Sequence, residues 1–439
     1  MATVVLPLMY FFSHCNSGTS VDNSSIPSDS STIAAGENSF IQYCSGCHNF
    51  RQDGIGPQLG GLTTKVSADW IQHFIKDPQQ MISSGDVRAR QLFNKYKSVM
   101  PSFPALKDDE VNAIIAFLHT HKFPVQLTTK DNGKELSNPI PDTIAFSDLL
   151  VNLEPVIQIP PSSDSGKLPL TRITKLSFQP NTGSLFINDL RGKLYKLQQN
   201  KPVVYMDMAK LSPKFIHEPG LATGFGSFAF HPDFSKNGLL YTTHTEAPGS
   251  GKADFGYPDS FKVIVQWVLT EWKTDPSAAT FSGTSRELLR VNMVTGAHGV
   301  QEIIFNPLSK PGEKDYGLLY IGVGDGGCVQ IGYPFLTHSI EKIWGTILRI
   351  DPMGRNSANG QYGIPKNNLF AKNQNTKTPG EIYAYGFRNP HRITWTKSGQ
   401  MLAFNIGQAN IESINLIKPG QNYGWPIREG DLFLIHMAI

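Results

Sequence analysis

The run Cys44-Ser45-Gly46-Cys47-His48 constrains this 439-residue chain more than any other feature of its sequence. On a helix, Cys44 and Cys47 lie three positions apart and face the same side, so both thiols can bond to the vinyl groups of one haem. His48 follows one turn after Cys44 and can offer its imidazole to the iron. A zinc knuckle would need further ligands at close spacing, and a redox cysteine pair would need a βαβ context; neither is found. The run therefore predicts a covalently attached haem c with His48 as an axial ligand.

Three further segments support an all-α haem domain over residues 34–122. Gly36 and Phe40 precede the first cysteine at helical spacing. Residues 54–59 read Gly-Ile-Gly-Pro-Gln-Leu, and residues 99–103 read Val-Met-Pro-Ser-Phe. Together these segments resemble a class I cytochrome c. In that family a proline carbonyl of the first loop orients the histidine ligand, and a methionine of the second loop is the sixth ligand.

The resemblance implies that Met100 is the second iron ligand. Met81 is the alternative, but no proline follows it. A core methionine remains the other interpretation of Met100. A His/Met pair raises the haem potential and suits electron transfer.

Residues 1–33 are predicted to be a leader and a tether. Residues 2–12 are apolar apart from Tyr10 and too few to span a bilayer, which is typical of the hydrophobic part of a secretory signal. Residues 16–32 are rich in Ser, Asn and Asp. Three interpretations stay open: a lipid on Cys15, a plain secretory signal, and a wrongly assigned start, since no Lys or Arg precedes Arg51. We expect a periplasmic or otherwise extracytoplasmic protein, anchored to a membrane if Cys15 is lipidated.

The pattern changes to short apolar runs from residue 168 to residue 439, after a proline-containing linker at 123–167. Runs of this length bounded by Gly, Pro, Asn and Asp predict strands. Those at 184–187, 238–241 and 317–321 share one form, in which Gly or Ser precedes apolar and aromatic residues. Such degenerate repetition predicts an all-β propeller or another radial fold, although a sandwich also fits.

Several segments of this β part occur in the order seen in the soluble glucose and sorbosone dehydrogenases. They are the runs at 228–234, 319–327, 348–351, 385–390, 414–417 and 422–426. The chain therefore resembles this family of six-bladed propellers that use pyrroloquinoline quinone. The resemblance implies His298 as the catalytic base, nine residues before Pro307. Ala297 stands where relatives have an acidic residue or Asn, so His298 is expected to lack its orienting neighbour; a structural loop histidine is the alternative.

The same resemblance implies the cofactor contacts. Arg388 and Asn389 match the pair that contacts the quinone, and a guanidinium suits an anionic conjugated ring; a salt link between blades is the alternative for Arg388. Gly407 and Gln408 match two residues whose backbone carbonyls bind calcium, a cation that prefers oxygen ligands. Asp325, in Gly-Asp-Gly-Gly, is interpreted as a turn residue, and the alternative is that it approaches the cofactor.

The predicted function is that of a quinohaemoprotein dehydrogenase. The propeller would oxidise a sugar, aldose or polyol, and electrons would pass through haem c to a respiratory acceptor, either a cytochrome or an oxidase. The alternative is a non-catalytic propeller used for binding, in a chain that acts only as a haem electron carrier. The formal net charge of +3 is too small to indicate a nucleic-acid partner.

The propeller is expected to be incomplete. About four blade-sized units fit between residues 168 and 439, and only thirteen residues follow Pro426. Open strand edges would make the β part unstable. We expect weak or absent sugar-dependent haem reduction that returns when further C-terminal sequence is supplied. The competing hypothesis is a shorter, self-closed propeller that is active as it stands.

Overall fold

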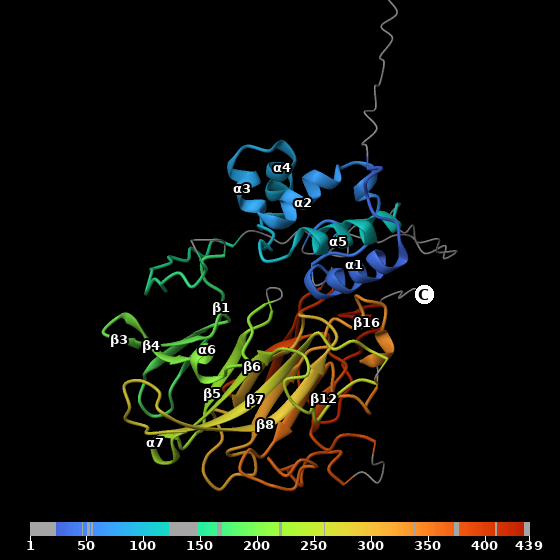
Figure 1. The fold of residues 1–439 in the computed structure, drawn as a ribbon. Helices are drawn as coiled ribbons and strands as arrows, with labels where there is room; N and C mark the ends of the chain where they lie inside the picture. Colours follow the sequence, from blue (N-terminus) through green and yellow to red (C-terminus); the bar gives the residue numbers. More distant parts are fainter. Residues whose placement is uncertain are drawn as a thin grey trace, which may run out of the picture.

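A computed structural model describes most of the chain as two bodies, one helical and one built of sheets (Figure 1). The described residues are 23–45, 47–50, 53, 56–122, 147–164, 169–218, 222–258, 260–337, 339–372, 377–408 and 411–433. The predicted lipid site Cys15 and most of the predicted linker lie outside these residues. Across the described ranges, no helix is both long and apolar enough to cross a membrane.

The helical body contains five α-helices and a short 3₁₀ turn. They are α1 (Ser30–Tyr43), η1 (Leu62–Thr64), α2 (Ala68–Lys76), α3 (Pro78–Ser83), α4 (Val87–Tyr96) and α5 (Asp108–Thr120). Side-chain oxygens cap the N-termini of four of these helices: Asp29 accepts from Thr32 N, Ser67 from Trp70 N, Asp77 from Gln80 N and Asp86 from Ala89 N. Such caps satisfy backbone donors that have no partner within the helix.

Helices α1 and α5 form the core of this body. A Cβ on Gly36 would lie 1.8 Å from the carbonyl oxygen of Ala113, so only glycine lets the two helices approach this closely. Phe40, one turn later, is buried and lies 5.0 Å from the ring centroid of Phe50 and 5.4 Å from that of Phe117. Helix α5 turns one apolar face to this core, because the side chains at 111, 114, 115 and 118 are all buried.

The second body contains four antiparallel sheets. Three have four strands, in the orders β1-β2-β3-β4, β5-β6-β7-β8 and β12-β11-β10-β9, and one has three strands, β13-β14-β15. The strands are β1 (Ile173–Phe178), β2 (Leu185–Asp189), β3 (Lys193–Gln198), β4 (Lys201–Asp207), β5 (Phe225–Phe230), β6 (Leu239–Glu246), β7 (Val265–Thr274), β8 (Gly283–Met293), β9 (Val300–Phe305), β10 (Leu319–Val323), β11 (Thr346–Ile350), β12 (Ile382–Tyr385), β13 (Pro390–Trp395), β14 (Met401–Asn405) and β15 (Ser413–Leu416).

Each sheet is a propeller blade built from consecutive strands. The first strand of each blade, which we call its inner strand, lies at a sheet edge: β1, β5, β9 and β13. Inner strands of different blades contact one another, β1 with β5, β5 with β9 and β9 with β13. The predicted propeller of about four blades is thus confirmed, and a short hairpin of β16 (Arg428–Glu429) and β17 (Leu432–Phe433) follows the fourth blade.

Candidate functional site

The helical body encloses a cavity at the predicted haem position. Its lining includes all four predicted haem residues, Cys44, Cys47, His48 and Met100. The rest of the wall is mostly apolar and aromatic, with side chains from α1, α2, α4 and α5. An apolar cavity with two thiols and an imidazole in its wall fits a large conjugated ring.

The ring of His48 is held in one orientation. Its Nδ1 lies 2.8 Å from the carbonyl oxygen of Pro57, which can only accept, so Nδ1 carries the proton and Nε2 keeps its lone pair. A Cβ on Gly56 would lie 2.4 Å from Cε1 of the ring, so this position leaves no room for a side chain. Burial lowers the pKa of His48, and the Pro57 hydrogen bond opposes that shift. The neutral ring is the form that binds a metal.

The two cysteines lie just after helix α1, not within it as the spacing argument assumed. Cys44 is the C-cap of α1, and its N–H donates to the carbonyl oxygen of Phe40 at 2.8 Å. One further helical turn follows, because the N–H of His48 donates to the carbonyl oxygen of Cys44 at 3.0 Å. The geometric relation therefore survives outside the helix. Burial raises the pKa of Cys44 to about 12 and that of Cys47 to about 11, so both sulfurs are protonated thiols.

The two methionines considered as ligands occupy different places. Met100 lines the cavity and packs against the helical core. Met81 lies in α3, and the described cavity lining does not include it. This arrangement favours Met100 as the residue that faces the iron.

In the β body, His298 contacts a carboxylate that the sequence did not assign to it. Nδ1 of His298 lies 2.7 Å from Oδ1 of Asp325, and the two side chains are 12% and 1% exposed. The expectation that His298 lacks an orienting group is therefore wrong. Asp325 is also the predicted turn residue, since Oδ1 accepts the N–H of Gly327 at 2.8 Å.

Asp325 is bound on every side. Its Oδ2 accepts from Nε1 of Trp425 at 3.0 Å, and its N–H donates to the carbonyl oxygen of Arg388 at 2.7 Å. Burial opposes ionisation of this carboxyl, but His298, Arg388 and the N–H of Gly327 outweigh burial and lower its pKa. Asp325 is thus an anion held in place by groups from three separate loops.

Arg388 lies beside this pair as a buried cation. Its Nε donates to Oε1 of Gln408 at 2.9 Å, and its guanidinium lies 5.7 Å from the ring centroid of Trp425. Burial lowers the pKa of Arg388, and Asp325 opposes that shift. No carboxylate of the described residues lies at ion-pair distance from Arg388, so the alternative role of Arg388 in a salt link between blades is not supported. Asn389 is buried next to it, and its N–H donates to Oδ1 of Asn405 at 2.9 Å.

The predicted calcium residues lie in the loop between β14 and β15. A Cβ on Gly407 would lie 2.0 Å from the carbonyl oxygen of Ile411 and 2.6 Å from Oε1 of Glu429. The backbone here therefore runs close to a buried carboxylate. The described residues contain no cluster of three or more His, Cys, Asp or Glu side chains that could hold a metal. A calcium ion at this place would depend on carbonyl oxygens.

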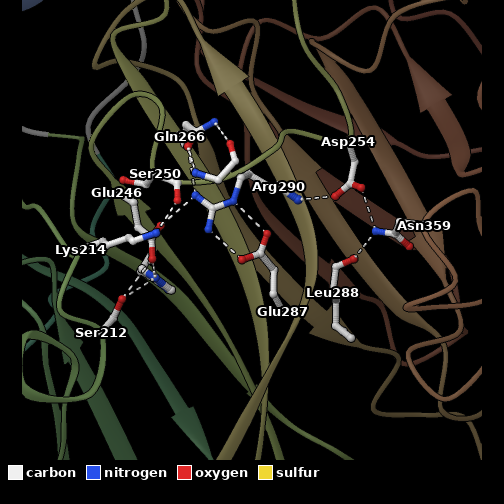
Figure 2. A network of polar contacts seen from close by, with 12 residues as sticks. Ser212, Lys214, Glu246, Ser250, Asp254, Gln266, Glu287, Leu288, Arg290 and Asn359 are labelled. Carbon is white, nitrogen blue, oxygen red and sulfur yellow. Dashed lines mark hydrogen bonds and ion pairs between the residues drawn. The ribbon is translucent and has the colours of Figure 1, made fainter.

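A polar network in the second blade supports the loop next to this site (Figure 2). Arg290, on β8, donates to Oε2 of Glu246 at 2.8 Å and to Oε2 of Glu287 at 2.7 Å. Gln266, on β7, holds the loop that follows β6. Its Oε1 accepts from the N–H of Gly251 at 3.1 Å, and its Nε2 donates to the carbonyl oxygen of Gly251 at 3.0 Å. The network fixes residues 247–258 against the blade.

That loop reaches the Asp325 turn through Tyr257. The ring of Tyr257 stacks on Trp344 at 4.0 Å, and its hydroxyl lies 3.7 Å from Sγ of Cys328. Cys328 is fully buried, as expected of a cysteine that fills space. A Cβ on Gly326 would lie 3.1 Å from the Tyr257 hydroxyl, so the loop and the turn are in contact.

Sequence reasoning missed the contacts of three residues in this site. Asp325 contacts His298, while Trp425 and Gln408 contact Arg388, and the sequence-based hypothesis assigned none of these contacts. A usable signal existed only for Asp325, an aspartate directly after a strand with a Gly-Gly turn behind it. Trp425 reaches Asp325 from 100 positions away, a relation that spacing cannot reveal.

The chain combines a helical domain, whose cavity is lined by the CxxCH run, with a β-propeller that buries a His–Asp–Arg cluster. This combination is typical of a class of two-domain redox proteins. Comparison with family models agrees. Residues 170–433 match the model "Glucose / Sorbosone dehydrogenase", and residues 33–122 match "Cytochrome c". The chain belongs to the glucose/sorbosone dehydrogenase family and carries a cytochrome c domain before the propeller.

Individual relatives are distant. HIPL1 protein of Arabidopsis thaliana is 29% identical over 48% of this chain and 34% of its own length. Quinoprotein glucose dehydrogenase B of Acinetobacter calcoaceticus is 26% identical over 49% of this chain and 42% of its own length. The PQQ-bound aldose sugar dehydrogenase structure from Streptomyces coelicolor is 20% identical, with a TM-score of 0.43, over 60% of this chain and 64% of its own. The chain thus spans well under half the length of these two curated relatives.

Proposed function

We propose that this protein is a quinohaemoprotein dehydrogenase that oxidises a sugar, aldose or related polyol and passes the electrons to haem c. The observation that carries the proposal is the His298–Asp325 pair, with its 2.7 Å contact, beside the buried Arg388. A base, an orienting carboxylate and a cation at one place are the groups that an alcohol oxidation needs. Family membership supports the same activity.

His298 would take the proton of the substrate hydroxyl. Burial and Arg388 lower the pKa of His298, while Asp325 opposes that shift, so the ring is neutral near pH 7 and can accept a proton. Asp325 would accept a hydrogen bond from Nδ1–H of His298, which leaves the Nε2 lone pair for the substrate. Asp325 therefore orients the ring and stabilises its protonated form.

Pyrroloquinoline quinone, when bound, would supply the acceptor for the two electrons of the oxidised carbon. This chain offers it a buried guanidinium at Arg388, the indole of Trp425 and the neighbouring Asn389. Arg388 forms no ion pair with a carboxylate of the described residues, so its guanidinium suits the carboxylates of such a cofactor. The family relative named as a quinoprotein supports this choice.

Calcium is the weaker part of the proposal. Gly407 and Gln408 would offer backbone carbonyls, and the buried carboxylate of Glu429 lies beside Gly407. Oxygen ligands of this kind suit calcium. The ion would add positive charge next to Arg388 and so favour an anionic cofactor.

Haem c would fill the cavity of the helical domain. Cys44 and Cys47 would form the two thioether bonds, and Nε2 of His48 and Sδ of Met100 would be the axial ligands. A His/Met haem transfers single electrons, so it would collect the two electrons of each oxidation one at a time and pass them to a cytochrome or an oxidase. Attachment of this type and the apolar leader support a periplasmic location, with Cys15 as a candidate lipid anchor.

A second candidate function is binding without catalysis, in which the chain carries electrons only through its haem. The similarity to HIPL1 protein, whose name states no dehydrogenase activity, supports this alternative. The presence of both His298 and Asp325 favours catalysis, because a purely binding propeller does not need a buried His–Asp pair.

The deciding experiment is haem reduction by sugar. The purified protein is loaded with quinone and calcium, an aldose is added without oxygen, and absorbance at the haem band is recorded. The proposal expects reduction that needs sugar, quinone and calcium together. Haem that stays oxidised with sugar at saturating cofactor, yet is reduced at once by dithionite, would favour the binding alternative.

A further inference from the structure

Polar and charged side chains from all four inner strands come together at one level of the propeller. The third residue of β1 is Lys175, of β5 Ser227, of β9 Glu302 and of β13 Arg392. One position in each blade thus provides a polar or charged side chain. Because the inner strands contact one another around the axis, these side chains converge there.

Glu302 is the centre of the group. Its Oε1 accepts from Nζ of Lys175 at 2.5 Å and from Oγ of Ser227 at 3.3 Å, and its Oε2 lies 3.9 Å from Nε of Arg392. Arg392 also donates to the carbonyl oxygen of Gln301 at 3.0 Å and to Oγ1 of Thr174 at 2.9 Å. Contacts therefore run from the third and fourth blades to the first, between blades that do not follow one another in the chain.

Lys175 is buried, with 7% of its side chain exposed, and its contacts fit the charged form of the amine. Nζ has three acceptors, Oε1 of Glu302 at 2.5 Å, the carbonyl oxygen of Ile303 at 2.7 Å and Oγ of Ser227 at 3.2 Å. An ammonium has three N–H donors and no lone pair, so it matches this set, whereas a neutral amine would turn its lone pair to an acceptor. Burial lowers the pKa of Lys175, and Glu302 opposes that shift.

The group has two cations and one anion, and so one positive charge in excess. Lys175 and Glu302 neutralise each other, while Arg392 is always protonated. Arg392 is partly buried, with 28% of its side chain exposed, so salt screens its charge less than that of a fully exposed residue.

Two members of this group lie on strands that directly follow residues of the candidate site, because β9 follows His298 and β13 follows Arg388. Glu302 follows His298 by four residues, roughly 13 Å along an extended strand. Arg392 follows Arg388 by four residues and Asn389 by three. The groups that face His298 are Asp325 from the loop after β10, Arg388 before β13 and His391 on β13.

We propose that Lys175, Glu302 and Arg392 form a charged group that acts on the site. The uncompensated positive charge of this group strengthens the binding of an anionic cofactor next to His298. The anion is a polycarboxylate of the quinone type, so this part rests on the proposed function. The same charge disfavours protonation of His298, an effect that needs no cofactor.

A charge series tests the proposal. Lys175→Met lowers the net charge of the group to zero and Glu302→Gln raises it to two. The double variant Lys175→Met/Glu302→Gln restores one positive charge but lacks the ion pair. It is therefore the matched control for the loss of the Lys175–Glu302 contact between blades. Replacing both members of a buried pair is tolerated better than removing one, and the double variant keeps the series informative if Glu302→Gln does not fold.

Two readouts are measured on protein whose near-ultraviolet circular dichroism shows a folded propeller. The first is the Kd of pyrroloquinoline quinone, compared with that of its uncharged trimethyl ester. We expect Lys175→Met to weaken quinone binding about 3- to 10-fold and Glu302→Gln to strengthen it, with the double variant within about 2-fold of the wild type. The ester should bind equally to all four proteins.

The second readout is the pKa of His298 by NMR in the protein without quinone. It should rise in Lys175→Met, fall in Glu302→Gln and stay near the wild-type value in the double variant. Equal loss of quinone affinity in Lys175→Met and the double variant, or one unchanged pKa of His298 throughout, would overturn the proposal. If the wild type binds no quinone, the proposed function fails, and the order of the His298 pKa values alone decides the inference.

Discussion

The two candidate redox sites of this chain are built in opposite ways. The haem cavity takes its chemical groups from one segment, residues 44–100, and surrounds them with apolar side chains. The propeller site joins His298, Asp325, Arg388 and Trp425, which come from separate loops and are buried together with their charges. The first centre is a pocket with a motif in its wall, and the second is a network of charges held by the fold.

This difference explains how the two centres should respond to substitution. In the haem cavity each of the four proposed side chains would act through its own bond to the cofactor, so replacing one should leave the others in place. In the propeller site Asp325 contacts both His298 and Trp425, so removing its charge leaves its buried neighbours without their partner. We therefore expect local effects in the first centre and coupled effects in the second.

The largest expected effect is the loss of the base in the propeller site. His298→Ala should lower sugar turnover by roughly 10²- to 10⁴-fold, the usual contribution of a general base. Quinone affinity should change little, because Arg388 and Trp425 remain. Steady-state kinetics and a quinone titration check this, and unchanged turnover would make His298 a structural residue.

The next effect concerns the residue that orients the base. Asp325→Asn should lower turnover by about 10- to 10⁴-fold, with the upper value expected when the carboxylate that orients a catalytic histidine becomes an amide. It should also lower the pKa of His298, because the carboxylate that favours the protonated ring is gone. The acidic limb of the pH–rate profile should therefore move to lower pH. A turnover loss with an unshifted profile would mean that Asp325 only supports the fold.

In the haem centre we expect a spectral change without loss of the cofactor. Met100→Ala should keep the haem attached through Cys44 and Cys47, lower its potential and remove the sulfur–iron absorption band. Met81→Ala is the matched control and should leave the band unchanged. The ligand assignment is wrong if the band survives in the first variant and disappears in the second.

The smallest effect concerns the network in Figure 2 and depends on pH. Burial opposes the charge of Glu246, but His244 and Arg290 outweigh it and lower the pKa of Glu246 from 4.5 to about 2. A lowered pKa in the folded state stabilises the protein above about pH 4.5, and this contribution disappears as the pH falls toward 2.

Glu246→Gln should therefore cost about 1–3 kcal/mol of unfolding free energy at pH 7 and less near pH 3. Denaturant unfolding at both pH values measures this, with the exposed Glu341→Gln as a control for removing one negative charge. An equal cost at both pH values would show that the charge of Glu246 does not contribute.

The sequence allowed the haem centre to be predicted closely and the propeller site only in part. Cys44, Cys47, His48 and Pro57 lie within fourteen positions, so a motif and a loop were enough to place them. The partner of His298 lies 27 positions away and reaches it only after β9 and β10 pair. The preceding residue, Ala297, gave the wrong expectation, because the fold supplies the carboxylate from another loop.

The blade count could be predicted because each strand leaves a local pattern, whereas the contacts at the axis could not. Lys175, Glu302 and Arg392 are isolated charges within apolar strands, and only the arrangement of the blades brings them together. The expected weak or absent sugar-dependent haem reduction, and its return when further C-terminal sequence is supplied, stay predictions.

The most direct test of the central claim is the rate at which sugar reduces the haem. Protein with saturating quinone and calcium is mixed anaerobically with an aldose, and the haem band is followed at several protein concentrations, with His298→Ala alongside. If both centres act in one chain, the haem is reduced at a rate that does not depend on protein concentration, and His298→Ala slows it by the same factor as turnover. Haem that stays oxidised, or that is reduced equally fast in His298→Ala, would contradict the account.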